Sequence, residues 1–309
     1  MKLSRKILFA SIILSVGAAQ ATPVTLTGNY IKTAVNDVGT LGSGGSTSPG
    51  LLFDVTGTSN FAANNDYLTP GSPYDYFGVR TDQSGLTGNA NSFGSSITAT
   101  SGPTDLSSGS TNSASWSGTY ASFFNIVNTY TFGDSGQRID VNTTITALQN
   151  LTGVQFARSI DPDPDVNTFG DYNTVNSLGN ATLGLAATDW AYSLGLSTGL
   201  PLGLFTNSSI THNAGIVSNW GGAGSVAADP TAILAGINDG NGDYAIALGF
   251  DIGSILAGNS VSFDYAYVMG LTKDTVVVVD PSAVPVPGAV WLFGSAIAGF
   301  AGFGRRKSI

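Results

Sequence analysis

The sequence predicts an all-β fold, an antiparallel β-sandwich with long Gly/Ser-rich loops. Glycine contributes 41 of the 309 residues, and Ser, Thr and Asn are abundant. These residues disfavour helices, because Gly loses much conformational entropy and the polar three compete for backbone hydrogen bonds. The chain is nevertheless 42% hydrophobic and 10% aromatic, which is enough for a packed core and unlike a disordered composition. Short apolar runs separated by polar turns, with no long helical period, indicate a sandwich.

Five strand candidates in the first half combine β-branched or aromatic residues with partial alternation. They are Leu51–Val55, Tyr76–Arg80, Trp116–Thr131 (two strands or one long bent strand), Arg138–Leu148 and Val154–Ile160. In the last of these, alternate residues, Arg158 among them, point to the same face. Two stretches rich in Gly and Ser, 36–50 and 101–115, are expected to be loops.

The second half predicts further strands and one short helix. The strand candidates are Leu183–Ala187, Ala191–Leu196, Tyr244–Phe250, Val261–Gly270 and Thr275–Val279. The third and fourth are expected to form a hairpin bridged by Asp251–Ser260, with Phe263, Tyr265 and Tyr267 on one core-facing side. A helix is expected to begin with Asp229 as N-cap and Pro230 as first residue, and to end before Gly236.

The N-terminus has the features of a signal peptide. Lys2, Arg5 and Lys6 precede an apolar stretch, and Ala19-Gln20-Ala21 gives a small-x-small cleavage pattern. This predicts a signal helix in residues 1–21, export through the Sec translocon and cleavage after Ala21. A permanent N-terminal anchor is the weaker alternative, because the apolar stretch is short.

The C-terminal residues 284–309 have three parts. Pro285-Val286-Pro287 interrupts regular structure, because proline fixes φ and lacks an N–H. Residues 288–304 carry no charge and as a helix would be roughly 25 Å long, short for a bilayer core of about 30 Å but tolerable with local thinning. Arg305, Arg306 and Lys307 follow and favour a cytoplasmic end. A single transmembrane helix is predicted.

This tail resembles the PEP-CTERM sorting signal of Gram-negative bacteria. The match extends through Trp291 in the run Trp-Leu-Phe-Gly-Ser, whereas Val286 stands where the name-giving motif has Glu. The resemblance implies processing by an exosortase, transient residence in the inner membrane, and delivery to the cell envelope or extracellular matrix. An ordinary anchor helix and a buried core helix are the alternatives. The chain then divides into a signal peptide (1–21), an ectodomain (22–283) and a sorting signal (284–309).

The ectodomain is also similar, more loosely, to a β-sandwich module of secreted surface proteins that has no established activity. The shared steps are 158–165 (Arg-x-x-Asp-Pro-Asp-x-Asp), Trp220 with Asp229-Pro230, and 242–258. This likeness supports the architecture and implies no function.

The charges of the ectodomain are strongly unbalanced. All 20 acidic residues of the chain are Asp, and only five basic residues lie between the signal peptide and the tail, which leaves a formal charge of −15. Such a surface repels nucleic acid and favours divalent cations. Because Asp also forms Asx-turns, most of these residues are expected to cap loops. The absence of Cys means that no disulfide contributes to folding.

Asp161, Asp163, Asp165 and Asn167 form the candidate metal site. Alternate residues of an extended segment point the same way, so their oxygens would converge on Ca²⁺. The segment is not an EF-hand loop, since Val166 and Tyr172 occupy the Gly and Glu positions. The alternative is a turn in which one of these carboxylates pairs with Arg158.

Other candidate sites are weaker. The turn Asn238–Asp243 offers a second oxygen-rich segment, although Asn-Gly and Asp-Gly pairs primarily indicate tight turns. His212, the single histidine, has no recognisable nucleophile motif beside it, so no catalytic residue is predicted. Four aromatic residues could form a sugar-stacking platform, although packing in the core or on an edge strand is the favoured interpretation: Tyr74, Tyr76, Trp190 and Trp220.

Together these features predict a non-enzymatic structural or adhesive protein of the exopolysaccharide matrix. The alternatives are a Ca²⁺-dependent carbohydrate-binding module that contacts exopolysaccharide and, with less support, a polysaccharide-modifying hydrolase. No nucleic-acid partner is expected.

Overall fold

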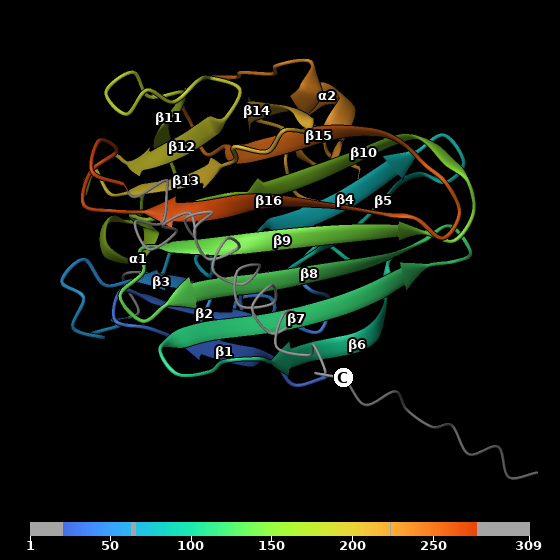
Figure 1. Ribbon diagram of the computed structural model, residues 1–309. Helices are drawn as coiled ribbons and strands as arrows, with labels where there is room; N and C mark the ends of the chain where they lie inside the picture. The colour runs from blue at the N-terminus through green and yellow to red at the C-terminus, as the bar shows by residue number, and fades with distance from the viewer. Residues whose placement is uncertain (1–20, 63–65, 223, 277–309) are drawn as a thin grey trace, which may run out of the picture.

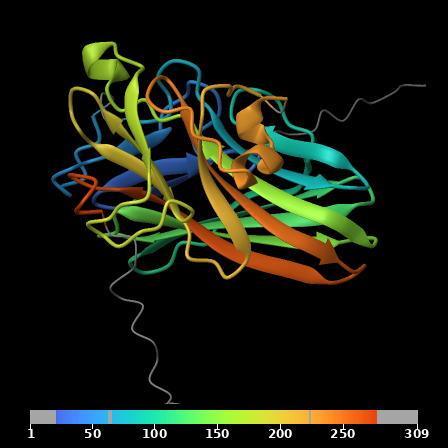
Figure 2. The same ribbon diagram turned by 90° about the horizontal axis from the view of Figure 1, so that it is seen from above.

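The computed structural model describes residues 21–62, 66–222 and 224–276, and it confirms the all-β prediction (Figure 1). A sheet of eight strands and a sheet of five lie face to face, as the view from above shows (Figure 2). A sheet of three strands lies along the lower side in Figure 1. Neighbouring strands within the sheets are antiparallel.

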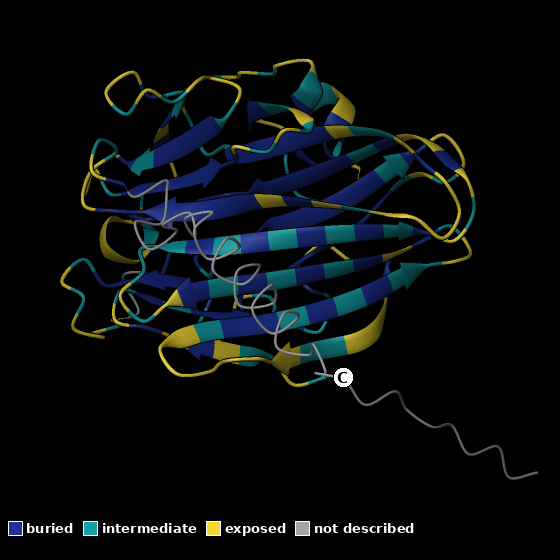
Figure 3. Cartoon of the chain, viewed as in Figure 1, coloured by how far each residue is buried: buried dark blue, intermediate teal, exposed yellow. Residues whose placement is uncertain are grey.

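The eight-stranded sheet has the order β11-β12-β13-β16-β9-β8-β7-β6. Its strands are β6 (Thr98–Asp105), β7 (Thr111–Tyr120), β8 (Phe124–Gly133), β9 (Arg138–Ala147), β11 (Thr174–Leu178), β12 (Trp190–Gly195), β13 (Pro201–Phe205) and β16 (Ser260–Met269). Strands β8 and β9 alternate strictly between buried residues and residues that are partly or fully exposed, so one face of this sheet covers the core (Figure 3).

The five-stranded sheet has the order β14-β15-β10-β4-β5, and the three-stranded sheet has the order β1-β2-β3. The former comprises β4 (Asp75–Thr81), β5 (Gly85–Ala90), β10 (Leu151–Ile160), β14 (Thr211–Val217) and β15 (Ala245–Ile255). The latter comprises β1 (Val24–Thr27), β2 (Ile31–Val35) and β3 (Leu51–Phe53). The described helices are short: α1 (Val166–Phe169), η2 (Val226–Ala228) and α2 (Pro230–Leu234).

Aromatic side chains join the two large sheets. Phe263 of β16 lies 5.0 Å from Phe156 and 4.8 Å from Phe250, measured between ring centroids. Further along the interface, Phe77 of β4 meets Trp116 of β7 edge-on at 5.5 Å. The predicted core-facing side of β16 is thereby confirmed, since Phe263, Tyr265 and Tyr267 are all buried.

A buried ion pair crosses this core. Arg158 of β10 is fully buried and pairs with Asp75 of β4, while its Nη1 donates to the hydroxyl of Tyr130 at 3.1 Å. Its guanidinium lies 5.3–5.7 Å from the rings of Phe77, Tyr130 and Tyr267. Burial lowers the pKa of Arg158, but the charge of Asp75 outweighs this effect and keeps that pKa well above its usual value.

The prediction that Arg158 pairs with Asp161, Asp163 or Asp165 is therefore wrong. Arg158 points into the sandwich and is neutralised by the adjacent strand. The aspartates follow the end of β10, where the chain has left the sheet.

The strands predicted between residues 116 and 160 are confirmed, with Trp116–Thr131 divided into β7 and β8. Residues 183–187 form a turn and not a strand, although Leu183 and Leu185 still pack against the cluster around Trp190. The predicted loop 101–115 is wrong in part, because β6 and β7 extend into it. Of Thr275–Val279, the described residues 275 and 276 are not in a strand, and the rest lie outside the described ranges.

The predicted hairpin between Tyr244–Phe250 and Val261–Gly270 is also wrong. Strand β15 continues to Ile255 and pairs with β10 and β14, whereas β16 pairs with β9 and β13. Residues 256–259 thus carry the chain from one sheet to the other. Two consecutive strands have the same sequence pattern whether they pair with each other or lie in different sheets.

Helix α2 forms as predicted. The Oδ1 of Asp229 accepts a hydrogen bond from the amide of Thr231 at 3.0 Å, and Pro230 opens the helix. Among the residues that the structure describes, no helix is long and apolar enough to cross a bilayer. The predicted signal helix up to Gln20 and the predicted transmembrane helix lie outside those residues.

Candidate metal centre

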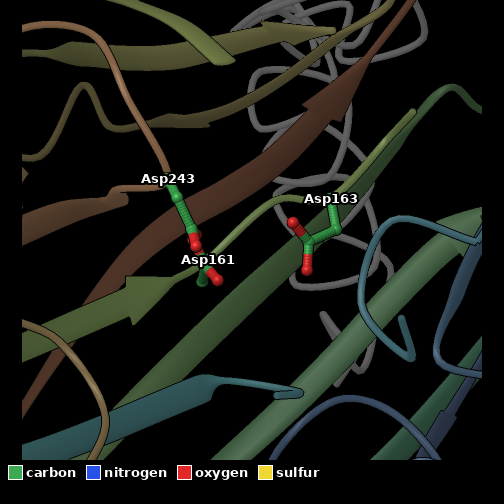
Figure 4. A group of neighbouring side chains, drawn as sticks. All are labelled: Asp161, Asp163 and Asp243. Carbon is green, nitrogen blue, oxygen red and sulfur yellow. The ribbon is translucent and has the colours of Figure 1, made fainter. Parts of the chain in front are cut away.

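Three carboxylates meet at one end of the five-stranded sheet. Oxygens of Asp161, Asp163 and Asp243 lie within 4.8 Å of one another (Figure 4). Asp161 and Asp163 follow the last residue of β10, and Asp243 precedes the first residue of β15. Because β10 and β15 are antiparallel neighbours, with Ile160 opposite Ile246, the end of one strand lies beside the start of the other.

The backbone fixes the Asp-Pro segment against an earlier loop. The amide of Asp161 donates to the carbonyl of Tyr74 at 2.9 Å, and the amide of Asp163 donates to that of Tyr67 at 2.8 Å. The prolines between and after them have no N–H to satisfy. Both backbone N–H groups of Asp161 and Asp163 are therefore hydrogen-bonded to the earlier loop, and this fixes the position of the segment that carries the two carboxylates.

Asp161 and Asp163 are buried and Asp243 is partly buried, and four of the six carboxylate oxygens are buried without a hydrogen-bond donor. Both oxygens of Asp161 and the Oδ1 atoms of Asp163 and Asp243 have no hydrogen-bond partner within the described part of the chain. Asp161 is 2% exposed and Asp163 is 3% exposed. Burial of an uncompensated charge is costly, and the usual remedies are a proton or a bound cation.

The pKa values reflect this isolation. Burial, followed by the charges of Asp163 and Asp243, raises the pKa of Asp161 well above its usual range. Burial and the charge of Asp243 raise the pKa of Asp163 to about 8. Burial also raises the pKa of Asp243. Without a cation, the raised pKa values therefore favour the protonated forms of these carboxyls.

The cluster opens into a pocket of about 390 Å³ that Gly71, Ser72, Tyr172 and Trp220 also line. The indole Nε1 of Trp220 donates to the backbone carbonyl of Asp243 at 2.9 Å, which ties the pocket wall to one of the carboxylate residues. Behind it, the Trp220 ring packs on Tyr74, with centroids 5.7 Å apart. At Gly71 (φ 68°) a Cβ would come within 2.7 Å of the Tyr172 ring, so a larger residue would disturb this wall.

The structure separates the four ligands predicted from the sequence. Asp161 and Asp163 come together, whereas Asp165 accepts hydrogen bonds from the Ser197 amide at 2.6 Å and the Thr198 hydroxyl at 2.6 Å. Asn167 lies exposed in α1. The alternation fails because Asp165 has helical backbone angles, φ −105° and ψ −7°, and the expected extended run stops there.

Asp243 was missed as a partner of the Asp-Pro segment. It belongs to the Asn238–Asp243 turn, which the sequence offered as a separate candidate. The pairing of β10 with β15 brings the two segments together. The sequence-based prediction instead paired Tyr244–Phe250 with Val261–Gly270, and so it did not place Asp243 beside β10.

Other aspartates cap loops, as expected. Asp54 accepts the amides of Thr56, Thr58 and Asn60, and Asp66 accepts four amides, from Gly50, Leu51, Leu68 and Thr69. Burial raises the pKa of Asp54, but hydrogen bonds from Thr56, Asn60 and Thr58 outweigh this effect and hold that pKa well below its usual value. Loop capping thus accounts for Asp54 and Asp66 but not for the Asp161–Asp163–Asp243 cluster.

His212 and three of the four aromatic candidates do not line this pocket. The Nε2 of His212 is 3.1 Å from Asp189 Oδ1, and its Nδ1 is 2.6 Å from the carbonyl of Ile210. Of the candidate sugar-stacking residues, three are fully buried packing residues: Tyr74, Tyr76 and Trp190. Trp220 alone of those four lines the pocket.

No protein-family model and no curated protein matches the chain. Solved structures are similar to it at low identity and low TM-score. An α-mannosidase from Enterococcus faecalis is 10% identical with a TM-score of 0.41, covering 81% of this chain but 30% of the mannosidase. Slr1438 from Synechocystis is 8% identical with a TM-score of 0.45, covering 84% and 100%. A galactose mutarotase related enzyme from Lactobacillus acidophilus is 10% identical with a TM-score of 0.33, covering 81% and 98%.

These neighbours overturn one sequence-based expectation. The similar structures include sugar-processing enzymes, which contradicts the prediction of a non-enzymatic structural or adhesive protein of the exopolysaccharide matrix. We do not retain that prediction. No catalytic residue is carried over from these structures, whose TM-scores lie below 0.5.

Proposed function

We propose that this protein binds a divalent cation, Ca²⁺, through Asp161, Asp163 and Asp243. The observation that supports this most directly is the set of buried carboxylate oxygens that face one another without donors. Each carboxylate offers two oxygens, and Ca²⁺ takes roughly six to eight oxygens at about 2.3–2.6 Å. The pocket leaves room for water to complete the shell.

Ca²⁺ fits this arrangement better than Mg²⁺. Mg²⁺ requires near-ideal octahedral geometry and gives up its water reluctantly, whereas Ca²⁺ tolerates irregular carboxylate cages. Three carboxylates from two different segments, stiffened by prolines, form an irregular cage. A bound Ca²⁺ would compensate most of their negative charge and join the end of β10 to the start of β15.

The test is isothermal titration of the EDTA-treated protein with CaCl₂. Wild type should bind one ion, and Asp163→Asn should weaken binding at least about tenfold, because it removes a ligand charge that the ion needs. Asp105→Asn, at a fully exposed aspartate that caps Ser107, is the matched control and should bind like wild type. Absence of heat with Ca²⁺, Mg²⁺ and Mn²⁺ alike would overturn the proposal.

We further propose that the chain is exported and sorted. The basic, apolar and Ala-x-Ala parts of residues 1–21 and the Pro-x-Pro, apolar and Arg/Lys parts of residues 284–309 support handling by the Sec translocon and an exosortase. Intact-mass measurement of the envelope or secreted form should show a start at Thr22 and loss of residues beyond the Pro285–Pro287 region. A mature chain that still ends at Ile309 would contradict sorting.

A second candidate function is sugar processing by acid–base catalysis at the same carboxylates. It is favoured by Asp163, whose pKa of about 8 would keep it protonated as a general acid in a pocket lined by Trp220 and Tyr172. Release of reducing ends from polysaccharides, measured with EDTA present, should then occur in wild type and vanish in Asp163→Asn. Tight Ca²⁺ binding would displace the proton of Asp163 and decide against this candidate.

A further inference from the structure

We propose that Asn176 of β11 is a positioning residue that holds Asp243 in the cation centre. This inference rests on the proposed cation site, because it concerns how one of the three ligands is kept in place. Asn176 lies on the edge strand of the other sheet and is 7% exposed. It does not itself belong to the carboxylate cluster.

Asn176 contacts the turn that carries Asp243 through both backbone and side chain. Its amide N–H donates to the side-chain oxygen of Asn241 at 2.8 Å. Its Nδ2 donates to the carbonyls of Gly240 at 3.2 Å and Gly242 at 3.3 Å. The residue immediately before the ligand is therefore bonded directly to the Asn176 side chain.

The Asn176 side chain is itself fixed. Its Oδ1 accepts hydrogen bonds from the hydroxyls of Thr174 at 2.8 Å and Ser193 at 2.6 Å. Thr174 adds a reciprocal pair of backbone hydrogen bonds with Gly242, each 3.1 Å long. The buried side-chain amide of Asn176 thus accepts hydrogen bonds through Oδ1 and donates two through Nδ2. A fully hydrogen-bonded buried amide is a rigid support for the turn.

The turn needs such a support because its own backbone is permissive. Gly240 and Gly242 have φ values of 85° and 151°, and glycine gains much conformational freedom when it is released. A Cβ at Gly242 would lie 2.7 Å from the Tyr244 ring, so the sequence cannot stiffen this position with a larger residue. Further hydrogen bonds hold its ends: the amide of Ser218 donates to Asp239 at 2.7 Å, and the indole of Trp220 donates to the Asp243 carbonyl.

The chain connectivity makes this support specific to the site. The segment that supplies Asp161 and Asp163 continues through α1 into β11. One continuous stretch thus carries two ligands and the residue that positions the third. Ordering of this stretch by the cation should also order the Asn238–Asp243 turn.

The experiment measures the Ca²⁺ dissociation constant of the full chain by titration, together with the melting temperature in EDTA. Asn176→Ala and the near-isosteric Asn176→Asp both lose the donors to Gly240 and Gly242. Each should raise the dissociation constant about tenfold or more, as is typical when a residue that orients a metal ligand is lost. Val175→Ala, at an exposed residue next to Asn176 on β11, is the control and should bind within about twofold of wild type.

Hydrogen exchange separates positioning from a general structural role. In wild type, Ca²⁺ should slow exchange of the amides of residues 238–243, and in Asn176→Asp this protection should be reduced. Variants that melt earlier in EDTA yet bind Ca²⁺ with the wild-type constant would overturn the inference and leave the cation site intact. Wild type that binds no cation would instead overturn the proposed function, and this inference with it.

Discussion

Replacement of Arg158 by Met tests whether the ion pair inside the sandwich is needed for stability. The substitution keeps an unbranched apolar stem but leaves the Asp75 carboxylate, fully buried, with only the Tyr267 hydroxyl and the Leu41 amide as donors. Removal of one partner of a buried pair costs about 3–5 kcal/mol, because the remaining charge has no counter-ion. For a domain of this size, that loss should lower the melting temperature by roughly 6–20 °C.

Urea denaturation followed by tryptophan fluorescence, in EDTA at pH 7, measures the free energy of unfolding directly. The double variant Arg158→Met with Asp75→Leu removes both charges and should recover most of the loss, since apolar replacement of a buried pair is often close to neutral. A loss below about 1 kcal/mol in the single variant, or no recovery in the double variant, would refute the reasoning.

Two further predictions concern pH and a helix cap. The folded-state pKa of Asp163 is raised to about 8, so the carboxyl contributes stability that is present below its unfolded pKa of about 3.9 and is lost as pH rises through 8. The EDTA-treated protein should therefore melt at a higher temperature at pH 5 than at pH 8.5, and millimolar Ca²⁺ should reduce this difference; an apo melting temperature that rises with pH would contradict the assignment. Asp229→Ala should cost about 1–2 kcal/mol in a urea titration, because it removes the N-cap of α2 and the partly exposed pair with Arg80, and an unchanged midpoint would show that neither contact matters.

The sequence predicted well what depends on local pattern. The alternation in β8 and β9, the Asp-Pro start of α2 and the buried face of β16 all follow from side-chain periodicity or capping chemistry. Strands such as β11 and β13 were missed, since Thr174–Leu178 is polar and Pro201–Phe205 is buried throughout and shows no alternation. These strands exist because neighbours in the sheet complete their hydrogen bonds.

The candidate site was predicted only in part, because one of its residues depends on strand pairing and not on a local pattern. Asp161 and Asp163 belong to a recognisable local segment, whereas Asp243 lies about 80 residues away and joins them only through the register of β10 and β15. Asp165 was assigned to the site by its spacing. A local change to helical backbone angles turned its side chain toward Ser197 and Thr198 instead.

The crossover at residues 256–259 determines when this molecule can fold. Strand β15 lies between β14 and β10 in one sheet, and β16 lies between β13 and β9 in the other. Until both have emerged, each sheet consists of two separate pieces, and the faces of the core stay open to solvent. A chain delivered residue by residue from its N-terminus therefore cannot close its sandwich until the last strands arrive, and then both sheets are completed almost together. Such late, long-range pairing is slow, and for a chain exported as proposed above it would leave completion of the sandwich to follow translocation.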